Sequence, residues 1–220
     1  MPNVSEWQMI GVGFLQSIYM TFVSTALSYV IGLPLGLLLV VSDKDGLHPR
    51  PALNAVLGVI VNILRSLPFL ILAVLFQPFT SAIVGTSIGS TATIVPLVIA
   101  SAPYVARLVE SSIKEVDKGI VEAAESMGAS TQQIVWKVLL PEARPSLLVG
   151  GAIAITTILS YSAMAGFIAG GGLGDIAIRY GVYKYKTTIM FITSAILVVI
   201  VQVLQAIGMK LARIGDKRIT

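Results

Sequence analysis

Five long apolar stretches, separated by polar segments, form the pattern of this 220-residue chain. An α-helix needs about 20 apolar residues to cross the hydrocarbon core of a bilayer, and each stretch reaches that length. The sequence therefore predicts an all-α, polytopic membrane protein in which residues 1–220 form a single transmembrane domain. The five predicted transmembrane helices cover residues 14–41, 54–77, 88–111, 147–169 and 187–211.

Composition supports a chain that is surrounded by lipid. Hydrophobic residues make up 55% of it and charged residues only 12%, whereas soluble domains carry about 25% charged residues. The chain has no cysteine, which excludes a disulfide framework and thiol chemistry. A net charge of +4 is compatible with nucleic acid, but in so apolar a chain the positions of the charges relative to the spans matter more. We expect the lipid bilayer, and no nucleic acid, as a partner.

The positions of lysine and arginine predict how the helices cross the membrane. Five spans put the termini on opposite sides, and the positive-inside rule then favours an N-terminus outside and a C-terminus inside. In that orientation the outer side holds only Arg179, Lys184 and Lys186, and Arg65 lies within a span. The inner segments hold Lys44, Arg50, Arg107, Lys114, Lys118, Lys137, Arg144, Lys210, Arg213, Lys217 and Arg218.

Prolines and small residues predict bends and close contacts within the spans. Pro34 is the expected bend of the long first span, and Gly32 and Gly36 form a small-residue face that allows another helix to approach. Pro96 and Pro103 interrupt the hydrogen bonding of the third span, which is tolerated where helices pack tightly or line a cavity.

The connections predict simple loops. We expect an uncharged loop at 78–87, a tight turn in the glycine-rich stretch 170–174, and an exposed, tyrosine-containing loop at 175–186. Arg107 and Glu110, at the inner end of the third span, predict a surface ion pair.

One polar island, residues 117–141, predicts two short amphipathic helices around a glycine. Asp117 can cap the first helix, and Gly128 lies where that helix must end with a positive φ. Ser130 and Gln133 form a capping-box pair for the second helix, which Pro141 is expected to stop. The predicted apolar stripes are Ile120, Val121, Ala124 and Met127 in the first helix and Ile134, Val135, Val138 and Leu139 in the second.

The spacing of this island resembles the EAA loop of the membrane subunits of bacterial ABC importers. Glu122-Ala123-Ala124 is followed after three residues by Gly128, and after nine more by Val138 and then Leu140-Pro141. The resemblance implies a cytoplasmic helix–Gly–helix coupling loop that docks into a cleft of an ATP-hydrolysing subunit. The coupling residues it implies are Glu122, Ala123, Ala124, Met127, Gly128 and Pro141. The alternative is a plain helical hairpin that links two spans.

Other short stretches extend the resemblance over nearly the whole chain. RSLPF, IVGTSIG, KVLLPEA, YSAMAG and GGGLG look like the permease of methionine importers. That resemblance implies a homodimer in the bacterial inner membrane, two ATP-binding subunits and an extracytoplasmic solute-binding lipoprotein. It implies methionine and close analogues as cargo, with ATP and Mg bound by the partner ATPase and no cofactor bound by this chain. Permeases for polar amino acids or glycine betaine share the loop and the size, so they remain the alternative.

Polar residues within two spans are candidates for the translocation path. Arg65 is expected deep in the second span, where an arginine is costly and indicates function, although a buried structural pair would also explain it. Tyr161 and its neighbours interrupt the apolar pattern of the fourth span, and packing explains them as well as a mildly apolar path does. The candidate path residues are Arg65, Ser66, Pro68, Tyr161, Ser162 and Met164.

Several other functions lack the residues they need. The glycine-rich stretch has neither the Lys-Ser/Thr of a P-loop nor the G-x-G-x-x-G spacing, and His48 has no neighbouring ligands for a metal site. Without a nucleophile–base pair, we expect this chain not to be an enzyme. An ATP-independent channel or carrier would need acidic residues in the middle of a span, and a scaffold would not need polar, proline-broken spans.

Overall fold

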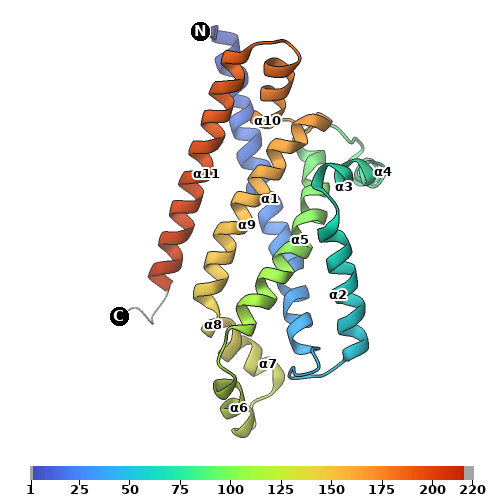
Figure 1. Cartoon of the computed structure of the whole chain (residues 1–220), viewed down its shortest axis with the longest axis vertical. Helices are drawn as coiled ribbons and strands as arrows, with labels where there is room; N and C mark the ends of the chain where they lie inside the picture. The colour runs from blue at the N-terminus through green and yellow to red at the C-terminus, as the bar shows by residue number, and fades with distance from the viewer. Residues whose placement is uncertain (1, 216–220) are drawn as a thin grey trace.

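The computed structural model describes residues 2–215, and every regular element among them is helical (Figure 1). Four helices of the described part are long and apolar enough to cross a membrane, and a bent pair supplies a fifth span if it is counted as one. The predicted all-α, multi-pass fold is therefore confirmed. The elements are α1 (Val4–Val41), α2 (Pro51–Ser66), α3 (Phe69–Leu75), α4 (Gln77–Val84), α5 (Ser90–Lys114), α6 (Lys118–Ser126), α7 (Thr131–Ile134), the π-helix η1 (Val135–Leu139), α8 (Leu140–Glu142), α9 (Arg144–Met164), the 3-10 helix η2 (Ala165–Ile168), α10 (Gly172–Ile176), the π-helix η3 (Ala177–Val182) and α11 (Thr187–Gly215).

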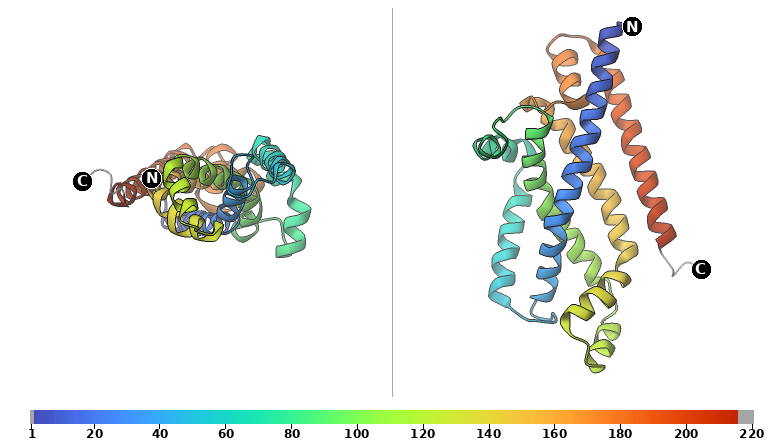
Figure 2. Two further views of the ribbon diagram at one scale, coloured as in Figure 1. Left: turned by 90° about the horizontal axis from the view of Figure 1, so that it is seen from below. Right: turned by 180° about the vertical axis from the view of Figure 1, so that it is seen from behind.

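The bundle is elongated, with the N-terminus at one end and the α6–α7 segment at the other (Figures 1 and 2). Helices α5, α9 and α11 match the third, fourth and fifth predicted spans to within a few residues. Lys217 and Arg218, two of the predicted inner charges, lie outside the described residues.

Helix α1 is longer than the first predicted span because it begins at Val4. The Asn3 side chain accepts a hydrogen bond from the Glu6 N–H at 2.9 Å, and the Glu6 carboxylate accepts one from the Asn3 N–H at 2.8 Å. This capping box fixes the start of the helix. The helix continues through Pro34 to Val41 without interruption. At helical rise its length is about 57 Å, well beyond a hydrocarbon core of about 30 Å.

Helix α1 packs along α5, and two glycines allow the close contact. A Cβ at Gly32 would lie 2.7 Å from the carbonyl oxygen of Ala102, and one at Gly36 would lie 2.5 Å from that of Ala106. Both distances are shorter than Cβ contacts in real proteins, so a side chain at either position would push the two backbones apart. The predicted close contact at Gly32 and Gly36 is confirmed.

The second predicted span, 54–77, is broken rather than continuous. Helix α2 ends at Ser66, Leu67 is extended, and α3 then leaves at an angle of 104°. Pro68 explains the break, since proline disfavours the helical conformation of the residue before it and has no N–H of its own to donate.

The predicted loop at 78–87 is wrong over most of its length, because α4 occupies Gln77–Val84. Pro78 lies in the first turn of this helix, where a missing N–H loses no hydrogen bond. The proline and polar residues that we interpreted as a loop are therefore the start of a helix.

Only the start of the glycine-rich stretch 170–174 is the predicted turn, because Gly170 and Gly171 are non-helical and α10 begins at Gly172. Two side chains of α1 cap the new helix: Gln16 accepts from the Gly172 N–H and Ser17 from the Leu173 N–H, each at 2.9 Å. These bonds attach the turn to the N-terminal half of α1.

The predicted exposed loop at 175–186 is wrong in its first half. Helix α10 and η3 run to Val182, and Asp175 is buried and paired with Arg179. Burial against α1 and α9 accounts for this, since it covers a segment whose polar residues alone indicate solvent. The uncovered part is Val182–Lys186, with Tyr183 and Tyr185 strongly exposed.

Candidate coupling segment and translocation path

The first half of the coupling segment (residues 117–141) is a short helix with one buried face. Asp117 caps α6, its carboxylate accepting from the Gly119 N–H at 2.6 Å, as predicted. Ala124 is buried and Val121 half-buried. The predicted stripe is wrong at Ile120, which is 43% exposed, and at Met127, which is 82% exposed. Met127 is the residue that ends the helix, so its side chain no longer follows the helical face.

Glu122 and Ala123 lie on the exposed side of α6, with Glu122 at the edge of a cavity that the α1–α2 turn also lines. Both are exposed, whereas the next residue, Ala124, is 5% exposed. The exposed face of α6 is thus free to contact another protein, while its opposite face holds it to the bundle.

Gly128 joins the two halves in the conformation the sequence predicts. Its φ is +78°, in the region that L side chains rarely adopt. The Gly128 N–H donates to the Glu125 carbonyl at 2.8 Å and the Ala129 N–H to the Ala124 carbonyl at 3.1 Å. These two bonds satisfy carbonyls at the end of α6.

The second half begins with the predicted capping box. Ser130 Oγ accepts from the Gln133 N–H at 3.4 Å, and the Gln133 side chain accepts from the Ser130 N–H at 2.8 Å. The helix then runs from α7 through η1 to α8. Its buried side chains are Ile134, Val135 and Leu139, with Val138 half-buried, so this predicted stripe is confirmed.

Pro141 does not stop the second helix where the sequence predicts. The helical path continues to Glu142, and α9 begins at Arg144. The turn before the proline is wider than an α-turn, since the Leu140 N–H donates to the Val135 carbonyl five residues back. The next residue, Pro141, has no N–H to place, so the path can pass through it.

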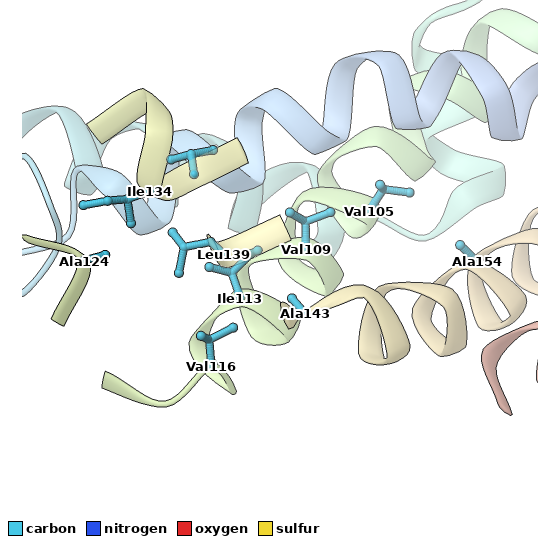
Figure 3. Close-up of a cluster of buried hydrophobic side chains, with 10 residues drawn as sticks. Val105, Val109, Ile113, Val116, Ala124, Ile134, Leu139, Ala143 and Ala154 are labelled. Atoms are coloured by element: carbon cyan, nitrogen blue, oxygen red, sulfur yellow. The ribbon is translucent and has the colours of Figure 1, made fainter. Parts of the chain in front are cut away.

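A buried apolar cluster fixes the coupling segment to the transmembrane helices (Figure 3). Three turns of α5 contribute Val105, Val109 and Ile113 to this cluster, and α6 contributes Ala124. The rest of the cluster is Val116, Ile134, Val135, Leu139, Ala143 and Ala154. Movement of the segment would therefore be transmitted to α5 through packed side chains.

A charged network lies beside this cluster and joins three elements. Arg107 Nη1 lies 2.6 Å from a Glu110 carboxylate oxygen, and Lys114 Nζ lies 2.9 Å from the other. Lys114 also lies 2.8 Å from the carboxylate of Asp43, in the turn that joins α1 to α2. Arg107 reaches Asn62 Oδ1 of α2 at 2.9 Å. The pairing thus connects α5 with both α2 and the α1–α2 turn.

The predicted ion pair between Arg107 and Glu110 is present, but its predicted position at the surface is wrong, because the Glu110 side chain is only 11% exposed. Two positive partners and burial under α2 and the α1–α2 turn keep its carboxylate away from solvent. The spacings of three between Arg107 and Glu110 and four between Glu110 and Lys114 were the signal in the sequence. In the turn, the ammonium of Lys114 holds the pKa of Asp43 below its usual range.

The candidate path residues divide between two places. Arg65, Ser66 and Pro68 lie at the break between α2 and α3, and all three are exposed. Tyr161 of α9 stacks flat on Phe69, the first residue of α3, with ring centroids 5.1 Å apart. The structure thus brings Tyr161 next to the break that contains Pro68.

The other two path candidates differ from Tyr161 in their surroundings. Ser162 is buried and donates to the Leu159 carbonyl at 2.8 Å, whereas Met164 is 39% exposed. Within residues 2–215, no three His, Asp or Glu side chains gather where they could hold a metal ion.

The structure is a multi-pass helical bundle with a helix–Gly–helix segment packed against one end. The sequence model described as "Binding-protein-dependent transport system inner membrane component" matches residues 32–220. The chain belongs to this family, and the predicted family resemblance is confirmed.

Curated relatives and solved structures are similar over most of the chain. The probable D-methionine transport system permease protein MetI of Vibrio cholerae is 52% identical over 92% of this chain and 90% of its own length. The methionine import system permease protein MetP of Bacillus subtilis is 43% identical over 82% of each.

Among solved structures, a chain of the MetNI methionine ABC transporter in inward-facing conformations has a TM-score of 0.97. It is 42% identical, over 98% of this chain and 100% of that chain. An amino acid ABC transporter solved with histidines has a TM-score of 0.79 over 96% of this chain and 95% of that one. Its 24% identity shows a shared fold only.

Proposed function

We propose that this chain is the permease subunit of an ATP-driven importer of methionine and close analogues. The observation that carries the proposal is the 52% identity, over nearly the full length of both chains, to the probable D-methionine transport system permease protein of Vibrio cholerae. The 42% identity to the MetNI permease chain, at a TM-score of 0.97, supports the same cargo. The binding-protein-dependent family supports import rather than export.

The assembly we propose is a homodimer with two ATP-binding subunits and an extracytoplasmic solute-binding lipoprotein. Four or five spans are few to enclose a path for a solute, and closed two-fold dimers are the commonest assembly. The exposed face of α6 supplies a contact surface for the ATP-binding subunit. In this proposal the ATP-binding subunit binds ATP and Mg, whereas this chain binds no cofactor of its own and is coupled to hydrolysis by contact.

The coupling residues act in two ways in this proposal. Glu122 and Ala123 lie on the exposed face, together with Met127, and contact the ATP-binding subunit. Ala124 and Gly128 shape the segment, by burial and by backbone conformation respectively. Pro141 lies where the segment joins α9.

Uptake by reconstituted complexes tests the cargo. The chain, its cognate ATP-binding subunit and its solute-binding protein are placed in proteoliposomes that contain ATP, and entry of radiolabelled methionine is measured. We expect saturable, ATP-dependent uptake that unlabelled methionine suppresses and glycine betaine or histidine does not. Absence of ATP-dependent methionine uptake, together with ATP-dependent entry of radiolabelled glycine betaine or histidine into the same proteoliposomes, would assign the chain to another solute.

We propose that the N-terminus lies outside and that the coupling segment and the end of α11 lie in the cytoplasm. Arg213 of α11 lines one cavity with Glu115 and Glu142, beside the coupling segment. Lys186, at the start of α11, pairs with Glu6 at the start of α1. The two ends of α11 thus lie at opposite ends of the bundle, in agreement with the positive-inside pattern.

A reporter experiment checks this orientation. An N-terminal tag should react with a membrane-impermeant label applied to the periplasmic face of intact spheroplasts, and a C-terminal reporter should be active only in the cytoplasm. The reverse pattern would contradict both the charge argument and the cytoplasmic position of α6.

Tyr161 provides a test that separates packing from transport. Tyr161→Ala removes the ring that stacks on Phe69, and aromatic pairs contribute about 0.5–1.5 kcal/mol beyond area burial. We expect this variant to lose thermal stability and most methionine uptake while it still binds the ATP-binding subunit. Tyr161→Phe is the matched control because it keeps the stack and removes only the hydroxyl. Reduced uptake with unchanged stability in Tyr161→Phe would place the hydroxyl in the path.

A further inference from the structure

A cavity of about 490 Å³ separates the α1–α2 turn from α6. Its apolar wall comes from three parts of the chain, with Leu47 from the turn, Ile113 from α5 and Val121 from α6. A water molecule takes about 30 Å³ in the liquid, so the space is large enough for a whole side chain. Half of the coupling segment therefore forms one side of a cavity whose other side is the turn.

Carboxylates from both sides line this cavity. Asp43 and Asp45 come from the turn, and Glu122 and Glu125 come from α6. Asp43 is already paired with Lys114 at 2.8 Å. Asp45 has only a weak ion pair, because it lies 3.8 Å from Lys44 and both side chains are exposed. Such pairs contribute little to stability.

The balance of unpaired charge in the cavity is negative. Within residues 2–215, Glu122 and Glu125 form no ion pair, and Lys118 is the one lining cation that forms none. An apolar wall with acidic side chains above it complements an aliphatic stem that ends in a cation. Arginine and lysine have that chemistry.

We propose that this cavity is a second docking site for the ATP-binding subunit, which inserts an arginine or lysine side chain between the α1–α2 turn and α6. The inference rests on the proposed function, since it extends the contact surface of α6 to a neighbouring segment. Its basis is the continuity of the cavity with α6, together with the complementary shape and charge.

The site also has a route to the transmembrane helices. Asp43 of the turn is joined through Lys114 and Glu110 to Arg107, which reaches Asn62 of α2. A cation that enters the cavity beside Asp45 therefore acts on a turn that is ion-paired to α5, and Arg107 of α5 is in turn hydrogen-bonded to Asn62 of α2. The coupling segment contacts α5 through apolar packing. The α1–α2 turn contacts α5 through an ion pair, which is a second, separate connection.

Charge reversal at the rim tests the site. The purified chain in nanodiscs is titrated with its cognate ATP-binding subunit, and the dissociation constant is measured at low and high salt. We expect Asp45→Lys to raise that constant about tenfold at low salt and clearly less at high salt, because the contact is electrostatic. Asp45→Asn, which removes the charge without reversing it, should have a smaller effect.

Glu115→Lys is the matched control. Glu115 is exposed at the same end of the molecule but lines the separate cavity beside α11. This variant should bind the ATP-binding subunit as the wild type does. An equal loss of affinity in Asp45→Lys and Glu115→Lys would mean that overall surface charge causes the effect, and it would overturn the proposed site.

Photo-crosslinking locates the partner directly. The chain has no cysteine, so Asp45→Cys carries a single thiol that accepts a benzophenone maleimide. Irradiation of the full complex should join this position to a peptide of the ATP-binding subunit that contains the arginine or lysine, and Glu115→Cys should give no adduct at that peptide. An adduct to lipid, or to the neighbouring permease alone, would overturn the inference.

Failure of this inference is distinguishable from failure of the proposed function. If wild type binds the ATP-binding subunit and imports methionine, but Asp45→Lys binds normally and Asp45→Cys gives no adduct, the second site is wrong and the permease function stands. If wild type itself binds no ATP-binding subunit, the proposed function is wrong.

Discussion

Gly128→Val is expected to leave the transmembrane bundle folded while ATP hydrolysis no longer drives uptake. Gly128 has a φ of +78°, and a β-branched residue held there carries strain of about 1–3 kcal/mol. A Cβ at this position would meet nothing within 4 Å, so the effect comes from the backbone alone. The turn relieves the strain by opening, which misaligns α6 relative to α7.

Methionine uptake and ATPase rate in the same proteoliposomes measure this effect. We expect uptake to fall at least tenfold, while residual hydrolysis becomes independent of the solute-binding protein. Gly128→Asn is the control, since asparagine tolerates positive φ better than other non-glycine residues, and it should keep most of the coupling. Coupled transport by Gly128→Val at the wild-type rate would mean that the segment is only a linker.

The parts of the coupling segment that the sequence predicts correctly depend on neighbours within a few residues. The Asp117 cap, the positive φ of Gly128 and the Ser130–Gln133 box each need only the local chain. The predictions at Met127 and Pro141 are wrong because the burial of Met127 and the effect of Pro141 depend on how the backbone runs at each helix end. Met127 ends its helix instead of continuing the stripe, and the wide turn of η1 lets the helical path pass through Pro141.

Contacts between distant segments explain the remaining differences. Glu110 is expected at the surface from its own span, but α2 and the α1–α2 turn cover it and supply Asn62 and Asp43 to its two cationic partners. Hydropathy likewise shows one apolar stretch at 54–77, because apolar content alone does not register the change of direction at Pro68. The pairing of Tyr161 with Phe69 is also absent from the sequence, which indicates no partner for either ring.

Gly36→Leu is expected to destabilise the whole bundle rather than transport alone. Even a Cβ here would lie 2.5 Å from the Ala106 carbonyl oxygen and 2.7 Å from the Val109 Cβ. Since the nearest atom belongs to the backbone of α5, the helices must separate, and overpacking of this kind costs about 1–3 kcal/mol or more. The separation would also disturb Val109 in the cluster that holds the coupling segment.

Thermal denaturation of the detergent-solubilised complex, with ATP-binding subunits attached, measures this loss. We expect Gly36→Leu to lower the melting temperature and the yield of assembled complex, and Gly36→Ala to do so to a smaller extent. Gly11→Leu is the matched control on the same helix, because a Cβ at Gly11 would meet nothing within 4 Å. Its leucine should be accommodated, and at an exposed helical position it also improves helix propensity. Equal stability of Gly36→Leu and Gly11→Leu would mean that α1 and α5 are not in close contact in the membrane, and the apolar attachment of the coupling segment would then need another basis.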